Sequence, residues 1–206
     1  MFLESIGRNK YGINSYILAD ENNKSAIVID PGVNYESIMY TLKENKFVLK
    51  AILLTHGHCD HIADVQKLKE KTEASVYCHV KDNELLMHAA LNYSKDFGMG
   101  NLEFSADELV RDGDELDFDG IKFSVIHTPG HTKGGVCYLS RNMMFTGDTL
   151  FAGSMGRTDL YGGNENHMNA SLNKLSKMSD NITVYPGHGP NSTMKIEKET
   201  NPFLRL

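Results

Sequence analysis

The chain has 206 residues, 40% of them hydrophobic, and a formal net charge of -6. This length predicts one domain spanning 1–206 with a sizeable core. The acidic balance argues against nucleic acid or an acidic membrane surface as a partner, because both attract a dense basic surface. No segment approaches the ~20 apolar residues of a membrane span. We therefore expect a monomer or small homo-oligomer that does not bind membranes.

Cysteine usage predicts the compartment. Cys59, Cys78 and Cys137 cannot all pair, and they show no C-x-x-C spacing, which is typical of free thiols in a reducing environment. The first residues contain no apolar stretch long enough for a secretory signal. Both observations favour a cytoplasmic protein.

Strand and helix patterns alternate along the chain. The first half is predicted to contain strands at Ser15–Leu18, Ala26–Ile29, Val48–Leu54 and Ser75–Cys78, with helices at Tyr35–Asn45, Ile62–Lys71 and Asp82–Leu91. Asn92–Asp107 is the least regular segment and is predicted to be a mobile insert. A second series from about Leu109 is predicted to contain strands at Glu115–Phe118, Ile121–His127, Val136–Leu139, Met143–Phe145 and Ile182–Tyr185, with helices at Asn166–Met178 and around Lys195–Glu199.

Each of the longer helical patterns carries a single apolar stripe, as Ile38, Met39 and Leu42 do in the first one. Helices of this kind bury one face against a sheet and expose the other. The pattern therefore predicts an α+β fold in which two sheets pack face to face and the helices lie outside them.

The densest group of chemically active side chains is Thr55-His56-Gly57-His58-Cys59-Asp60-His61, directly after an apolar run. Imidazoles and carboxylates are the side chains that bind divalent first-row metals best. His56 and His58, two positions apart, can converge on one ion. Asp60 and His61, further round the turn, can reach another. The motif therefore predicts two metals.

Four ligands on one turn cannot complete two metal shells, so others must come from elsewhere in the chain. Three further candidates follow apolar strands and glycine turns: His131 after Pro129-Gly130, Asp148 after Gly147, and His188 after Pro186-Gly187. Loops at one edge of a rigid sheet commonly carry functional sites, and glycine allows the sharp turns they need. We interpret the other histidines as structural: His79, His88, His127 and His167.

The motif H-x-H-x-D-H, followed by a distant His, an Asp after Gly and a His after Pro-Gly, resembles the metallo-β-lactamase superfamily from about Ser15 to His188. The resemblance implies a four-layer αβ/βα sandwich, with two mixed sheets flanked by helices and the site at one edge. It implies that the first metal is held by His56, His58 and His131. It implies that the second is held by Asp60, His61 and His188, with Asp148 as the bridge.

Two further segments, Gly147-Asp148-Thr149-Leu150-Phe151 and Gly156-Arg157-Thr158-Asp159-Leu160, are similar to those of short hydroxyacylglutathione hydrolases (the glyoxalase II group). This similarity implies a hydrolase that cleaves a small-molecule thioester. The expected nucleophile is a hydroxide shared by two divalent metals, zinc first, with iron or manganese also accepted. Asp60 is expected to orient this nucleophile or take its proton.

Residues around the metals were assigned supporting roles. Asp30, Thr55, Thr132 and Asp159 are candidates to accept hydrogen bonds from ligand imidazoles. Arg157 either pairs with Asp159 or contacts substrate. Cys59 is interpreted as a small filler between His58 and Asp60. Tyr93 and Tyr161 are interpreted as packing residues, with the lining of a substrate pocket as the alternative.

Alternatives to hydrolysis remain open. The Gly-Arg-Thr-Asp segment is shared with persulfide dioxygenases, in which one iron would be held by His56, His131 and Asp148. A di-iron redox module would place a carboxylate where this chain has His58. A purely structural zinc site is disfavoured because such sites are closed and commonly rich in cysteine.

The acyl carrier is also open. Full-length glyoxalase II proteins use basic residues in a carboxy-terminal extension to bind glutathione. Here Lys195, Lys198 and Arg205 are too few to be given that role.

Overall fold

The computed structural model describes residues 1–7, 11–32 and 34–204, so Arg205 lies outside the described residues. Two six-stranded sheets make up most of the fold, in the orders β1-β2-β3-β4-β5-β6 and β14-β13-β10-β9-β8-β7. Both sheets are mixed, because parallel and antiparallel neighbours occur in each. A short β11-β12 hairpin accompanies the second sheet.

The first half of the chain forms the first sheet and its helices. The elements are β1 (Phe2–Ile6), β2 (Ser15–Ala19), β3 (Ser25–Ile29), α1 (Tyr35–Asn45), β4 (Val48–Leu53), α2 (Cys59–Ile62), α3 (Val65–Thr72), β5 (Ser75–His79), α4 (Asn83–Leu86) and β6 (Glu108–Val110).

The second half forms the second sheet and the hairpin. The elements are β7 (Glu115–Phe118), β8 (Ile121–His127), β9 (Val136–Ser140), β10 (Met143–Gly147), β11 (Leu150–Phe151), β12 (Ser154–Met155), α5 (Glu165–Ser176), β13 (Thr183–Pro186), β14 (Ser192–Thr193) and α6 (Met194–Thr200).

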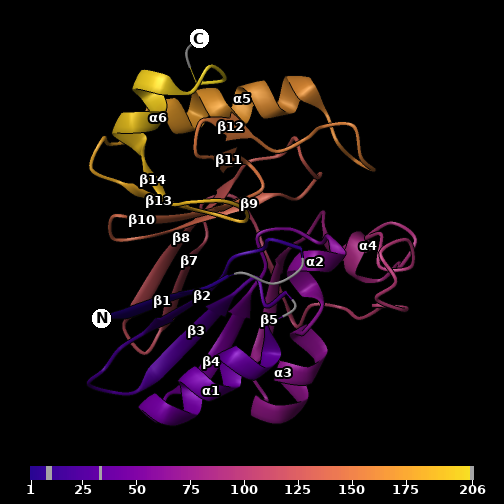
Figure 1. The fold of residues 1–206 in the computed structure, drawn as a ribbon, viewed down its shortest axis with the longest axis vertical. Coiled ribbons are helices and arrows are strands. Elements are labelled where there is room, and N and C mark those ends of the chain that lie inside the picture. The colour runs from indigo at the N-terminus through magenta and orange to yellow at the C-terminus, as the bar shows by residue number, and fades with distance from the viewer. Residues whose placement is uncertain (8–10, 33, 205–206) are drawn as a thin grey trace.

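The layers follow the order helix, sheet, sheet, helix. Helices α1 and α3 cover the outer face of the first sheet, and α5 and α6 cover the second (Figure 1). Alternation along β3 shows why: Val28 packs under the helices, whereas Ile27 and Ile29 point into the layer between the sheets. The predicted α+β sandwich is confirmed. Among the described residues, no helix has the length and apolar character to cross a membrane.

The helix predicted at Ile62–Lys71 is divided into α2 and α3. Asp64 breaks it, because its N–H donates to the carbonyl of Pro31 at 3.0 Å rather than continuing the helix. The Asp64 carboxylate then accepts the N–H groups of Asn34 and Tyr35 at 2.6 and 2.7 Å, and so caps α1. The break therefore serves a neighbouring helix.

The helix predicted at Asp82–Leu91 stops at Leu86. A longer helix would pair the carbonyls of Leu85 and Leu86 with N–H groups four residues ahead. Instead the Asn92 side-chain amide donates to the first carbonyl and the Phe104 N–H to the second, at 2.9 Å each. The segment that follows therefore takes over the hydrogen bonds of the last turns.

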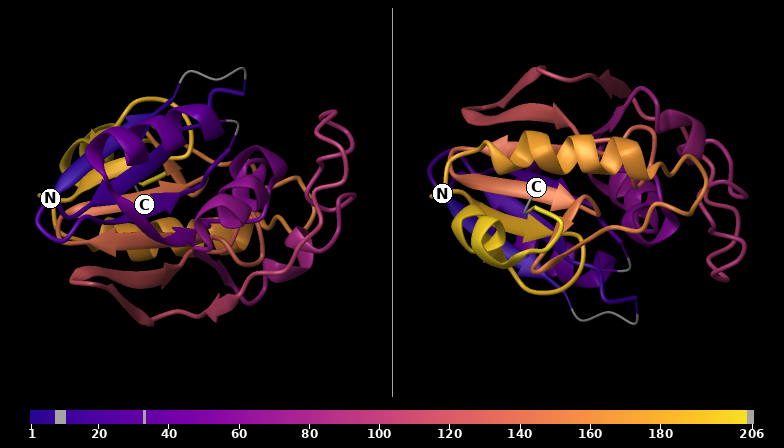
Figure 2. Two further views of the ribbon diagram at one scale, coloured as in Figure 1. Left: turned by 90° about the horizontal axis from the view of Figure 1, so that it is seen from below. Right: turned by 90° about the horizontal axis from the view of Figure 1, so that it is seen from above.

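The predicted irregularity of Asn92–Asp107 is confirmed, since the segment contains neither helix nor strand. It extends from one end of the sandwich beyond α4 (Figure 2). It is nevertheless anchored, because Asn92 and Ser94 are fully buried. Mobility of the segment stays a prediction.

The Glu197 carboxylate connects α6 to the rest of the second layer. It is 1% exposed and accepts hydrogen bonds from the Gly153 N–H, the Ser192 hydroxyl and the Asn201 amide.

We expect Glu197→Ala to lower the free energy of unfolding by about 2–3 kcal/mol, because these buried donors would lose their acceptor. Urea unfolding measures the change. The exposed Glu199→Ala should stay within about 0.5 kcal/mol, and equal effects of the two substitutions would contradict this account.

Candidate metal centre

Strands of both sheets end together at one edge of the sandwich. In the first sheet β3 and β4 are parallel. In the second, β10 and β13 are parallel, and β8 shares their direction because β8 and β10 are each antiparallel to β9. The segments after these strands carry Asp30 and all seven predicted ligands. The parallel arrangement therefore explains why residues far apart in the sequence meet.

The first predicted metal set forms one buried group. One ligand atom from each of His56, His58 and His131 lies within 4.8 Å of the others. Nδ1 of His58 and Nε2 of His131 are 2.9 Å apart. The two residues come from different sheets, so this group joins the sheets at their edge.

The second predicted set forms an adjacent group. Asp60, His61 and His188 also offer three ligand atoms within 4.8 Å of one another. Nε2 of His188 lies 3.3 Å from Oδ2 of Asp60. The side chains of Asp60 and His188 are 22% and 28% exposed, whereas His61 is buried. This group therefore faces the solvent more than the first.

Asp148 lies between the two groups. Its Oδ2 is 3.5 Å from Nε2 of His131 and 3.6 Å from Nε2 of His188, and its Oδ1 is 3.3 Å from Nε2 of His61. A carboxylate that touches members of both groups is in the position expected of a bridging ligand. The structure thus brings all seven sequence-predicted site residues together.

Hydrogen bonds on the far side of the rings fix which nitrogen faces the centre. The Asp30 carboxylate accepts from Nδ1 of His61 at 2.9 Å and from the Thr55 hydroxyl at 2.6 Å. That hydroxyl lies 3.1 Å from Nδ1 of His56. The carbonyl of Arg157 accepts from Nδ1 of His131 at 2.7 Å. These contacts assign the proton to Nδ1 and leave Nε2 of each ring available to a metal.

Asp30 also groups with His56 and His61 as a possible third cation site. However, Oδ1 of Asp30 accepts the Thr55 N–H at 2.7 Å, and Oδ2 accepts the Thr55 hydroxyl and the His61 ring. Both oxygens are therefore engaged by donors. We assign Asp30 to orienting ligands, as the sequence predicts, and not to binding an ion.

Burial and charge set the ionisation of the site. Burial, followed by the neighbouring imidazoles, holds the pKa of His56 well below its usual range and lowers the pKa of His58 to about 3. For Asp148, burial acts to raise the pKa, but His61 and the other imidazoles outweigh it and lower the pKa. Burial acts to lower the pKa of His61 and of His188, but Asp148 and Asp60 outweigh it and raise both pKa values. Neutral His56 and His58 and an ionised Asp148 are in the forms that bind metals.

The buried polar atoms test whether a metal fits. Nε2 of His58 is buried without a hydrogen-bond partner among the described residues, although Nδ1 is the atom of this ring that faces His131. Nε2 of His56, Nε2 of His61 and Oδ1 of Asp148 are also buried without a partner. Buried polar atoms without partners are rare in folded proteins and cost about 1–3 kcal/mol each. A cation at each group would satisfy them, so the donor set fits divalent metals.

Asp82 is a site residue that sequence reasoning missed. It is fully buried, and it accepts hydrogen bonds from the Gly57 N–H at 3.1 Å, the Thr132 hydroxyl at 2.7 Å and the Gly134 N–H at 2.6 Å. It thereby ties the loop of the heptapeptide motif to the loop of His131. In the sequence it looks like an ordinary helix-capping aspartate, and no local signal distinguishes it.

Two supporting assignments from the sequence differ from the structure. Thr132 donates to Asp82 and therefore acts through that carboxylate. Asp159 pairs with the Arg157 guanidinium, with Nε–Oδ1 and Nη2–Oδ2 both at 2.7 Å, while the main-chain carbonyl of Arg157 meets His131. Side-chain identity could not reveal an acceptor that belongs to the backbone.

Cys59 and the remaining histidines lie outside the ligand groups. Cys59 is buried, and burial raises the pKa of its thiol to about 12, which keeps the thiol protonated. His79 and His127 stack on each other with ring centroids 4.1 Å apart. None of the three belongs to a cation-binding group among the described residues, in keeping with the filler and structural interpretations.

Glycines allow the two sheets to meet this closely. A Cβ on Gly187 would lie 2.3 Å from Oδ1 of Asp148, and one on Gly147 would lie 2.3 Å from the Thr55 hydroxyl. Gly147 also has a φ of +47°, which favours glycine. Any side chain at these positions would push the loops apart, so the glycines of the sequence motifs are steric requirements of the site.

The comparisons agree with this architecture. A family model described as the metallo-beta-lactamase superfamily matches residues 8–188. The chain therefore belongs to the metallo-beta-lactamase superfamily, a group of metallo-hydrolases that bind divalent metals.

Individual relatives match over nearly the whole chain. The hydroxyacylglutathione hydrolase GloC of Haemophilus influenzae is 34% identical over 189 residues, which is 89% of each chain. The crystal structure of the BLEG-1 B3 metallo-beta-lactamase is 36% identical, covers 100% of both chains and has a TM-score of 0.93. The crystal structure of TTHA1623 in a di-iron-bound form is 33% identical, covers 99% of this chain and 100% of that one, and has a TM-score of 0.85.

Removing the Asp82 carboxylate should loosen both ligand loops. We expect Asp82→Ala to weaken metal affinity about 10–100-fold, as is typical when an outer hydrogen-bond partner of a metal site is lost. Competition with a chromophoric chelator measures the affinity. The exposed Asp117→Ala is the control and should leave it unchanged. If Asp82→Ala binds metal as tightly as the control, Asp82 does not position the loops.

Proposed function

We propose that this protein is a thioester hydrolase that uses two divalent metals, zinc in the first instance. The observation that carries the proposal is Asp148, whose two oxygens contact both ligand groups and so allow two ions to act on one substrate. The 34% identity to a hydroxyacylglutathione hydrolase supports an acyl-thiol substrate.

The ligand assignment follows the two groups. His56, His58 and His131 would hold the first metal, and Asp60, His61 and His188 the second, with Asp148 shared. When bound, such a pair brings the pKa of a shared water towards neutrality and polarises a carbonyl oxygen. Orienting the water and accepting its proton are tasks for the side chains of the protein.

We assign the proton of the attacking water to Asp60. It lies on the more exposed of the two groups, and its Oδ2 is 3.3 Å from Nε2 of His188 and 3.8 Å from Nε2 of His61. Burial acts to raise the pKa of Asp60, but His61 and His188 outweigh it and lower the pKa. An ionised carboxylate at this position can orient the water and accept its proton.

A thioester suits this set of side chains, because a thiolate leaves without a strong general acid. Arg157 is paired with Asp159, and both are largely exposed, so neither is a buried general acid. We further propose that the protein is cytoplasmic, that its substrate is a small molecule, and that it acts as a monomer or small homo-oligomer.

Metal removal tests the proposal directly. The metal-loaded protein should release thiol from S-D-lactoylglutathione or another small acyl thioester, and chelation should abolish this activity and lower the Tm, because a ligand that binds only the folded state stabilises it. Elemental analysis should give two metal ions per chain. Absence of thiol release from every thioester tested would refute the proposal, and a single iron with oxygen consumption would favour a dioxygenase.

Asp60→Asn tests the proton-transfer role. The amide keeps the size of the side chain but cannot accept the proton, so kcat should fall about 100-fold or more. Elemental analysis of the same sample separates this effect from metal loss. A variant with both metals and the kcat of the wild type would exclude Asp60 as the base.

A further inference from the structure

A small cavity opens over the candidate metal centre. Its volume is about 190 Å³, and besides the ligands and Cys59 its walls comprise Tyr11, Asn92, Tyr93, Phe97, Arg157 and Leu160. This volume lies below the roughly 300–1,000 Å³ of typical ligand pockets. The cavity can therefore enclose only one part of a thioester, and its aromatic walls suit the acyl part better than a polar carrier thiol.

Tyr93 forms the wall nearest the metal ligands. Its ring centroid lies 5.7 Å from that of His58. Its backbone has a φ of +65°, a conformation that is uncommon for an aromatic residue and that persists only where the surroundings impose it. The position of this side chain is therefore set by tertiary contacts.

Contacts on both sides hold Tyr93 in place. On the backbone side, the carbonyl of the preceding Asn92 accepts the Cys59 N–H of the metal motif at 2.9 Å. On the side-chain side, the Tyr93 hydroxyl accepts the Tyr161 N–H at 2.8 Å. The ring thus lies between the heptapeptide motif and the loop after β12, where its bulk closes off part of the cavity.

Part of the cavity wall is exposed to solvent. Tyr11 and Phe97 contact each other in this wall, with ring centroids 6.4 Å apart. The Phe97 side chain is 59% exposed, and the Arg157 side chain is 62% exposed. A carrier thiol can extend past these residues into solvent while the acyl group stays inside.

We propose that Tyr93 is a specificity-determining residue that limits the length of the acyl group, because its ring walls a cavity smaller than typical ligand pockets. The selected substrates are therefore thioesters with short acyl chains. The Tyr93 ring does not limit the size of the carrier thiol. This inference rests on the proposed thioester hydrolysis for its kinetic test but not for its binding test.

The kinetic test compares acyl chain lengths on one thiol. With acetyl, butanoyl, hexanoyl and octanoyl thioesters of N-acetylcysteamine, the wild type should lose at least about 10-fold in kcat/KM between butanoyl and octanoyl, since a tight pocket rejects added methylenes by such factors. Tyr93→Ala should remove most of this difference. Tyr93→Phe, which keeps the ring, should retain it.

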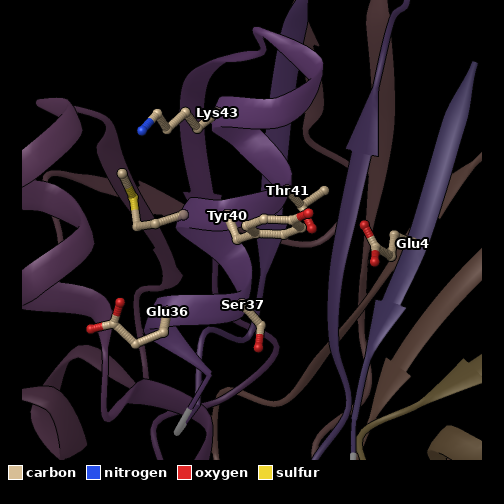
Figure 3. Close-up of a pocket in the computed structure, with 7 residues that line it drawn as sticks. Glu4, Glu36, Ser37, Tyr40, Thr41 and Lys43 are labelled. Carbon is tan, nitrogen blue, oxygen red and sulfur yellow. The ribbon is translucent and has the colours of Figure 1, made fainter.

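Tyr40→Ala is the matched control. Tyr40 is 67% exposed and extends from α1 towards Glu4 in a groove on the outer side of the first sheet (Figure 3). None of the metal-site residues lines this groove. The control should show the wild-type dependence on acyl length.

The binding test needs no turnover. Cobalt(II) replaces the native metals, and acetate, butanoate, hexanoate and octanoate are titrated while the visible cobalt spectrum reports binding. The wild type and Tyr93→Phe should bind the short acids and discriminate against octanoate, and Tyr93→Ala should not discriminate.

Two outcomes would overturn the proposal. One is that the wild type and Tyr93→Ala, both fully loaded with cobalt, show the same dependence of affinity on acid length. The other is that Tyr93→Phe behaves like Tyr93→Ala. Lack of thioester turnover with the expected binding pattern would refute only the proposed function.

Discussion

The structure depends on keeping several ligand atoms buried, close together and without protein hydrogen bonds. Nε2 of His56, Nε2 of His61 and Oδ1 of Asp148 are in this state, and each such atom carries a cost of about 1–3 kcal/mol unless a cation satisfies it. The arrangement persists because the other side of each group is firmly held. Asp30, Thr55 and the carbonyl of Arg157 engage the outer ring nitrogens.

This constraint explains features that are distant from the chemistry. Both sheets must present strand ends at one edge, so the strands that carry ligands share a direction within each sheet. The loops must approach more closely than side chains allow, which explains Gly147 and Gly187. A buried carboxylate, Asp82, then joins two ligand loops through three hydrogen bonds. Strand direction, the glycine positions and the Asp82 hydrogen bonds thus all help to keep the ligand atoms close together.

The sequence predicted the sandwich and the gathering of the ligands, because local hydrophobic periodicity and a dense metal motif encode them. It could not predict where tertiary contacts override local pattern. Asp64 interrupts an apolar helical stripe in order to cap α1, and Asn92 takes a carbonyl that α4 would have used. The strand Phe2–Ile6 was also missed, since its mixed polar sequence lacks regular alternation. Asp82 carries no local signal, because its partners lie about 25 and 50 residues away.

The two ligand groups draw on both halves of the chain, and this restricts the order of events during synthesis. On the proposed ligand assignment, the heptapeptide motif is made early, yet His131, Asp148 and His188 follow only with the second sheet. On that assignment, a nascent chain that has completed β6 contains only the ligands of the motif. Both ligand groups are complete only after the carboxy-terminal half has been synthesised and has packed against the first sheet.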